Sequence, residues 1–223
     1  MRQQIYKLLC PLLFSALTIP NAHADTQSFN DILRGSANGY GQVDSTTQTY
    51  ITGEFYTHYV AFFQFDLTSL SGQLSAASFT LTNPFIQSTA TSDTITLYAS
   101  PVAIPQAYVT YPNDLTSGSI LGNVNIAPTS GTLTDLTINL NSSALAILQA
   151  NEGHDFTIAM NLSSNNFADR IGTDASAPYY PGSLPPTPNN VLTIDTVTAH
   201  VPEPSLLALF STGIIGLGVL RKK

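Results

Sequence analysis

Basic residues are scarce in this chain, and most of them lie at its two ends. Of the seven Lys and Arg residues, only Arg34 and Arg170 fall within residues 25–200. The same segment holds 13 of the 14 acidic residues, so its formal charge is −11, whereas the whole chain carries −7. Such an acidic surface gains no affinity from releasing counterions around a phosphate backbone. We therefore expect no binding to nucleic acid, while a divalent cation or a neutral polysaccharide stays open as a partner.

Cysteine and tryptophan are also nearly absent. Cys10 is the single cysteine, and the chain has no tryptophan. Residues 25–200 therefore have no thiol for catalysis and no disulfide, and this segment must be stabilised by its core alone. The lack of tryptophan weakens the case for a sugar-binding surface built on broad flat rings. Cys10 does not indicate a lipoprotein, because Leu9 stands where a lipidation signal carries a small residue.

The N-terminus has the three parts of a secretory signal peptide. Residues 1–7 are short and basic, residues 8–19 are apolar, and residues 22–24 form an A-x-A pattern. This order predicts export by the Sec route, with cleavage between Ala24 and Asp25. We therefore divide the chain into a signal peptide over 1–24, an exported domain over 25–200 and a tail over 201–223.

The tail joins an acidic motif, an apolar run and a basic end. Pro202-Glu203-Pro204 is followed by the uncharged residues 205–220 and then by Arg221-Lys222-Lys223. A membrane-spanning helix needs about 20 apolar residues, so we expect one over about 203–220, close to the lower limit. The basic end should stay in the cytoplasm, which places the bulk of the protein outside. A buried C-terminal helix of the core is the alternative, and the terminal basic cluster disfavours it.

Pro202, Glu203 and Pro204, with the apolar span and basic terminus behind them, resemble the PEP-CTERM protein-sorting signal of Gram-negative bacteria. The resemblance covers residues 201–223. It implies recognition by an exosortase, a membrane-embedded cysteine transpeptidase that cleaves near the PEP motif. It further implies a transient anchor in the inner membrane and a final location at the cell surface or in the extracellular matrix. It implies no activity.

Residues 25–200 have the composition of an all-β domain. Thr, Val, Ile, Tyr and Phe favour strands, and Gly, Asn and Pro separate them. The pattern predicts roughly eight short strands, which is typical of a β-sandwich. The expected strands cover residues 41–52, 59–67, 75–82, 94–99, 119–126, 132–140, 155–162 and 190–199.

One short helix is expected between two of these strands. Ser142 or Ser143 serves as the predicted N-cap, residues 145–148 supply an apolar face, and Glu152-Gly153 ends the helix. We expect this helix to plug one end of the sandwich.

A second resemblance supports the fold. The stretch Phe63–Leu70 followed by Leu74–Leu81 is similar to a recurring element of jelly-roll sandwich domains in secreted bacterial proteins. There the first strand carries F-x-F-D-L, and a turn leads into a strand that begins with Ser-Ala. The resemblance implies a jelly-roll-like β-sandwich and transfers no catalytic residue.

The exported segment shows no recognisable catalytic motif. His58, His154 and His200 lack the spacing of an HExxH zinc site, and no Gly-x-Ser-x-Gly elbow occurs. The scarcity of Lys and Arg removes the usual clamps for an oxyanion or a phosphate. We therefore predict that the protein is not an enzyme and needs no cofactor. A glycan hydrolase that works with aspartates is the less favoured alternative.

Several residues are candidates for ligand contacts. Tyr108, Tyr111, Tyr179 and Tyr180 are candidate glycan-binding residues, and the last two open the proline-rich segment 177–188. A stiff connection to the last strand is the favoured interpretation of that segment, and a binding lip is the alternative, because proline favours extended backbone.

Calcium is a weaker possibility. Asp169 and Asp174 flank a loop-like stretch, and calcium takes six to eight oxygen ligands. A surface ion pair with Arg170 is the simpler interpretation of these carboxylates. Likewise, Asp66 is interpreted as a turn acceptor, and Glu152–Asp155 as a polar turn that leads from the helix into a strand.

The sequence thus predicts a non-catalytic surface or matrix protein, with a structural or adhesive role in extracellular polysaccharide. A carbohydrate-binding module that uses the four tyrosines is the alternative.

Overall fold

The computed structural model describes residues 22–44, 50–55, 57–89, 93–102, 112–164, 169–172 and 189–199. These residues form antiparallel strands and two short helices, which confirms the all-β class. The residues from Asp25 to Thr196 make one compact unit. Met1–Ala24 and Val197–Lys223 make a second unit, in which the described residues are few.

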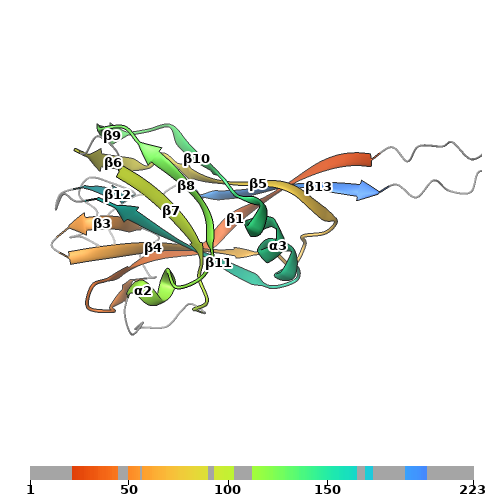
Figure 1. Ribbon diagram of the computed structural model, residues 1–223, viewed down its shortest axis with the longest axis horizontal. Coiled ribbons are helices and arrows are strands. Elements are labelled where there is room, and N and C mark those ends of the chain that lie inside the picture. The colour runs from red at the N-terminus through yellow and green to blue at the C-terminus, as the bar shows by residue number, and fades with distance from the viewer. Residues whose placement is uncertain are drawn as a thin grey trace, which may run out of the picture. The chain divides into compact units, whose positions relative to one another are not determined.

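One face of the core is formed by the strands that pair around β4 (Figure 1). β4 pairs with β1 on one side and with β11 and β3 on the other, and β11 continues through β7 to β8. The strands on this side are β1 (Ala22–Asn38), β2 (Val43–Asp44), β4 (Thr57–Asp66), β7 (Asp93–Ala99), β8 (Ile120–Ile126) and β11 (Asp155–Ser163).

The strands of the opposite face lie on the path β10-β5-β13-β1-β4-β3-β12-β6-β9, in which neighbours are hydrogen-bonded and β1 and β4 link the two halves. These strands are β3 (Ile51–Phe55), β5 (Gln73–Thr82), β6 (Phe85–Ser88), β9 (Thr129–Thr132), β10 (Asp135–Asn139), β12 (Arg170–Gly172) and β13 (Val191–Ala199). A bend separates β5 from β6, because Asn83 has a φ of 49° and Pro84 follows it. The chain that pairs with β5 and β6 is interrupted at the same position, because β10 pairs with β5 and β9 pairs with β6.

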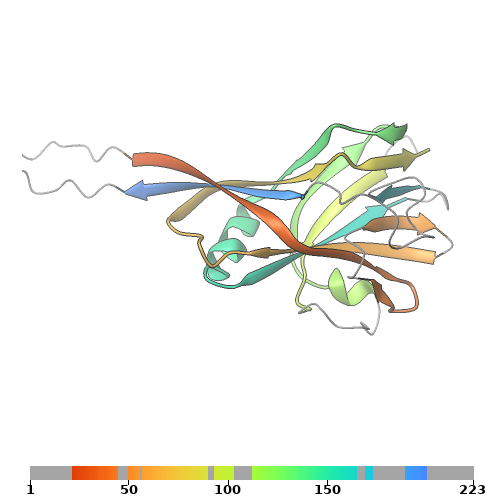
Figure 2. The same ribbon diagram turned by 180° about the vertical axis from the view of Figure 1, so that it is seen from behind.

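β1 is the longest strand, with 17 residues, and it joins both faces. Its first half lies against β13, where the Asp31 amide donates to the Asn190 carbonyl at 3.0 Å. A bulge at Ile32 changes the register, and the second half pairs with β4. Figure 2 shows this long strand from behind. We expected no strand here from the sequence, and that expectation was wrong.

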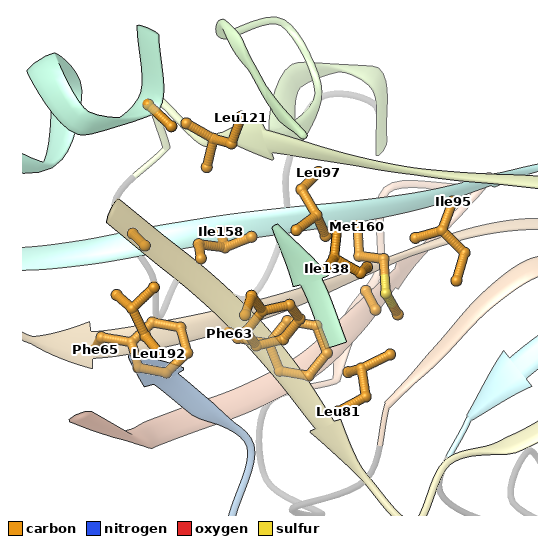
Figure 3. Packing of buried hydrophobic residues seen from close by; sticks show 14 of the residues in the cluster. Phe63, Phe65, Leu81, Ile95, Leu97, Leu121, Ile138, Ile158, Met160 and Leu192 are labelled. Carbon is orange, nitrogen blue, oxygen red and sulfur yellow. The ribbon is translucent and has the colours of Figure 1, made fainter. Parts of the chain in front are cut away.

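The core lies between the two faces and is rich in phenylalanine (Figure 3). The ring of Phe79 on β5 lies 5.0 Å from Phe63 and 6.0 Å from Phe65 on β4, measured between centroids. A second, smaller cluster lies on the other side of β4, where Phe62 packs with Leu115 of α2 (Pro112–Leu115). β4 is therefore buried on both sides, which explains its continuous apolar run.

The helix α3 (Ser142–Ala150) was predicted at the correct place but with the wrong cap. The N-cap is Asn141, whose side-chain oxygen accepts a hydrogen bond from the Ala144 amide at 2.9 Å. The Asn141 side chain also donates to the Ile120 carbonyl at 2.9 Å, so it ties the helix to β8. Ala144 and Leu148 are buried in the core, and α3 packs against β5 and β8.

Most of the other expected strands are present with altered limits. Residues 41–52 hold β2 and the start of β3 rather than one strand, and residues 45–49 lie outside the described part. Residues 132–140 are interrupted between Thr132 and Asp135. The short strands β6 and β12 were not expected at all.

No helix in the described residues is long and apolar enough to cross a membrane. The membrane helix expected over about 203–220 lies outside those residues.

Candidate functional sites

Many of the predicted site residues lie outside the described part of the chain. These are the glycan candidates Tyr108, Tyr111, Tyr179 and Tyr180, the calcium candidate Asp174, and the sorting motif Pro202, Glu203 and Pro204. Ala24 and Asp25, the predicted cleavage site, lie in β1 and are exposed. Cleavage between them stays a prediction.

The other calcium candidate, Asp169, is fully buried, and its hydrogen bonds connect neighbouring segments of the sandwich. Its Oδ1 accepts hydrogen bonds at 2.8 Å from both the amide and the hydroxyl of Thr89. Its Oδ2 accepts from the Ser164 hydroxyl at 2.7 Å, and its carbonyl accepts from the Glu54 amide at 3.0 Å. Arg170 lies over the ring of Phe85, with 6.0 Å between the guanidinium carbon and the ring centroid.

A buried ion pair not foreseen in the sequence lies where β1 leaves β13. Arg34 Nε is 2.9 Å from Asp31 Oδ2, and both side chains are almost completely buried. The Asp31 carboxylate also accepts two hydrogen bonds from Asn190, each at 3.0 Å. Arg34 donates a further bond to Asn189 at 2.9 Å. Burial raises the pKa of Asp31, and Arg34 and Asn190 oppose that rise.

His58 forms a cross-strand pair with Glu54. These two residues face each other in the β3–β4 hairpin, and His58 Nδ1 lies 2.8 Å from Glu54 Oε1. Both side chains are about one-third exposed. Among the described residues, Glu54 is the hydrogen-bond partner of the His58 ring.

The polar turns have structural roles. Asp66 Oδ1 accepts from the Thr68 amide at 2.9 Å, and hydrogen bonds from the side chain and backbone of Thr68 lower the pKa of Asp66. Glu152 accepts from Gln149 at 2.7 Å, whereas Asp155 accepts from Gln64 at 2.8 Å. These contacts confirm the interpretation of both segments as turns.

Metal ligands of the usual residue types do not gather in the described ranges. Within those ranges, no group of three or more His, Cys, Asp and Glu side chains is arranged to hold a metal ion.

The described unit is therefore a β-sandwich in which Asp31, Asp66 and Asp169 accept hydrogen bonds from neighbouring strands and turns. Residues 200–223 match the PEP-CTERM protein-sorting motif. This protein thus carries a PEP-CTERM sorting signal at its C-terminus, which implies export, a membrane-anchored stage and processing by an exosortase.

The remaining comparisons say little about activity. No curated protein matches the chain in sequence. Among solved structures, it is similar to the K1 cleaved adhesin domain of Lys-gingipain from Porphyromonas gingivalis W83, with 10% identity and a TM-score of 0.26. That alignment covers 79% of this chain and 99% of the adhesin domain.

Proposed function

We propose that this protein is a non-catalytic component of the cell surface, with a structural or adhesive role in extracellular polysaccharide. The observation that carries the proposal is the sorting segment at residues 200–223, which follows almost directly on the last strand of an exported sandwich. In this proposal the signal peptide ends at Ala24, and the exosortase removes the tail near Pro202.

The side-chain contacts of the sandwich support a non-catalytic role. Asp31, Asp66 and Asp169 each accept hydrogen bonds that fix a strand or a turn. A general acid or base must instead present its carboxyl group to a substrate. The charge of −11 over residues 25–200 also keeps a surface protein soluble and favours uncharged or cation-bridged partners.

The arrangement of the two ends of the compact unit supports display from a membrane anchor. Thr196 Oγ1 donates to the Asp25 carbonyl at 3.4 Å, so the first and last residues of this unit lie side by side. The leader and the tail therefore leave the unit at neighbouring points.

Cell fractionation of the native host tests the sorting step. We expect a processed form outside the cell, and a longer form that accumulates in the inner membrane when the exosortase is deleted or Glu203→Ala is introduced. The control is Asp135→Asn, which removes one negative charge from an exposed position in β10, as Glu203→Ala does in the tail. It should leave sorting unaltered. An intact chain in the cytoplasm with both ends uncut contradicts the proposal.

Binding to isolated matrix polysaccharide tests the role itself. We expect the processed protein to co-sediment with polysaccharide from its own host. Loss of binding in Tyr179→Ala/Tyr180→Ala, with retention in Tyr40→Ala, would favour the carbohydrate-binding module. Tyr40 serves as the control because it is an exposed tyrosine of the β1–β2 turn, at 79% exposure. Absence of binding to any fraction of the matrix contradicts a matrix role.

A further inference from the structure

Two buried polar side chains at the adjoining ends of β6 and β7 have unsatisfied oxygens. Asp93 is 1% exposed, and its Oδ2 accepts no hydrogen bond. Ser88 is 4% exposed, and its hydroxyl also has no hydrogen-bond partner. Proteins rarely bury such groups unsatisfied, and a buried carboxylate without a partner is costly unless a cation or a proton neutralises it.

The strand patterns direct both side chains into the sandwich. Asp93, Ile95 and Leu97 are the buried residues of β7, and the latter two belong to the main core. Ile86 of β6 belongs to the same core, and Ser88 lies two residues further along that strand. Because alternate residues of a strand share a face, Asp93 and Ser88 point toward the interior at the same end of the sandwich.

A second buried carboxylate lies at this end. β7 and β11 pair as far as Thr94 and Ser163, which places Ser164 beside Asp93. The Ser164 hydroxyl donates to Asp169 Oδ2 at 2.7 Å, and Asp169 is fully buried.

The carboxylate of Asp169 also contacts the residue that follows β6. Asp169 Oδ1 accepts both hydrogen bonds from Thr89, the residue directly after Ser88. Hydrogen bonds thus join Thr89, the neighbour of Ser88, to Asp169 and Asp169 to Ser164, which the strand register places beside Asp93. The strand registers therefore bring the two unsatisfied oxygens and the two carboxylates to the same end of the sandwich.

We propose that this region is a calcium site. The Asp93 carboxylate and the Ser88 hydroxyl are direct ligands, and backbone carbonyls and water complete the coordination. Asp169 already accepts three hydrogen bonds, so it contributes a second negative charge that draws the cation in. An all-oxygen set without His or Cys suits a hard cation, and the six to eight flexible positions of calcium suit it better than the strict octahedron of magnesium.

This site needs only the folded sandwich, so it stands independently of the proposed sorting and matrix role. From the sequence we expected Asp169 with Asp174, whereas the proposed site combines Asp169 with Asp93. The expected affinity is that of extracellular modules, with a dissociation constant of about 0.1–1 mM.

Thermal unfolding of the full chain in mild detergent, followed by circular dichroism, tests the proposal. At about 10 mM calcium the Tm should rise by about 3–10 °C over the value in chelator. Magnesium at matched ionic strength should give much less, which separates binding from charge screening. An equal rise with both cations, or no rise with either, overturns the proposal.

Three variants locate the effect. Asp93→Asn removes the buried charge, so it should be more stable than the wild type in chelator and should lose the response to calcium. Ser88→Ala keeps the fold and should weaken calcium binding several-fold in titration calorimetry. Asp135→Asn, an exposed control of equal charge change, should retain the full response.

An unchanged response to calcium in both Asp93→Asn and Ser88→Ala contradicts the site. If Asp93→Asn has the stability of the wild type in chelator as well as in calcium, the proposal fails.

Discussion

The buried pair of Asp31 and Arg34 places one of the two cations of the exported segment inside the molecule. Arg34 neutralises a carboxylate that also accepts two bonds from Asn190, so the pair connects β1 to the residue before β13. Removing one partner of such a pair leaves an uncompensated buried charge, which is more damaging than removing both.

Arg34→Met should therefore lower the free energy of unfolding by about 3–5 kcal/mol. The double variant Asp31→Asn/Arg34→Met should lose less than the sum of the two single changes, because no charge is left unpaired. Urea unfolding of the three variants, followed by circular dichroism, measures these values. Additive losses would show that the two side chains do not act as a pair.

The same carboxyl group predicts a pH dependence. Burial raises the folded pKa of Asp31 above its ordinary value of 3.8. Its contribution to stability is therefore full below about 3.8 and is lost as the pH rises through the folded pKa. Because Arg34 opposes this rise, the loss in Arg34→Met should extend to higher pH.

Urea unfolding at several pH values measures this shift. The double variant Asp31→Asn/Arg34→Met is the control, since it has no carboxyl group at this position. Identical pH profiles in Arg34→Met and in the double variant would exclude Asp31 as the source.

At the scale of the element, the start of α3 depends on a side chain that the sequence did not single out. Asn141, Ser142 and Ser143 are all common N-cap residues, so local preference does not choose among them. Packing decides, because the Asn141 side chain can bond the Ala144 amide and the Ile120 carbonyl together.

Asn141→Ala should lower the free energy of unfolding by about 1–2 kcal/mol, since both bonds are lost. Ser142→Ala and Ser143→Ala are matched controls on exposed neighbours and should cost less than about 0.5 kcal/mol. The same urea unfolding experiment measures all three. An equal loss of free energy of unfolding in Ser143→Ala and Asn141→Ala would show that Ser143 takes part in capping the helix.

Strands with an apolar pattern could be predicted from the sequence, and polar strands could not. β4 and β5 carry Phe63, Phe65, Phe79 and Leu81 at core-facing positions, and the expected ranges found them. β1 is mostly polar, and it is a strand because distant strands pair with both of its halves. Tertiary contacts override local preference in such segments.

The candidate sites show the same limit. Asp66 and Glu152–Asp155 were predicted correctly as turns, because the bonds of Asp66 to Thr68 and of Glu152 to Gln149 are local. The partners of Asp169 include Thr89, which lies 80 positions away in sequence. Asp31 and Asn190 are 159 positions apart. No local pattern indicates such contacts.

At the scale of the whole molecule, the excess of negative charge should make stability depend on salt. A charge of −11 over residues 25–200 repels itself in the compact state, and salt screens that repulsion. The Tm in chelator should therefore rise as sodium chloride increases from about 10 mM to about 0.5 M, over which the Debye length falls several-fold. Thermal unfolding measures the rise, with Asp135→Lys, an exposed reversal of charge, expected to show a smaller one. A Tm that falls with salt would show that attractive pairs outweigh the repulsion.

The last strand of the chain fills a central place in its sheet. β13 lies between β5 and β1. These two strands therefore cannot be paired on that side until residues 191–199 have been synthesised. Contacts between such distant segments slow folding. Under the proposed export route, the sandwich would therefore stay open along its middle until residues 191–199 have crossed the membrane. In that route the sorting segment at 200–223 follows next, and a transient anchor there would give the chain time to close before release.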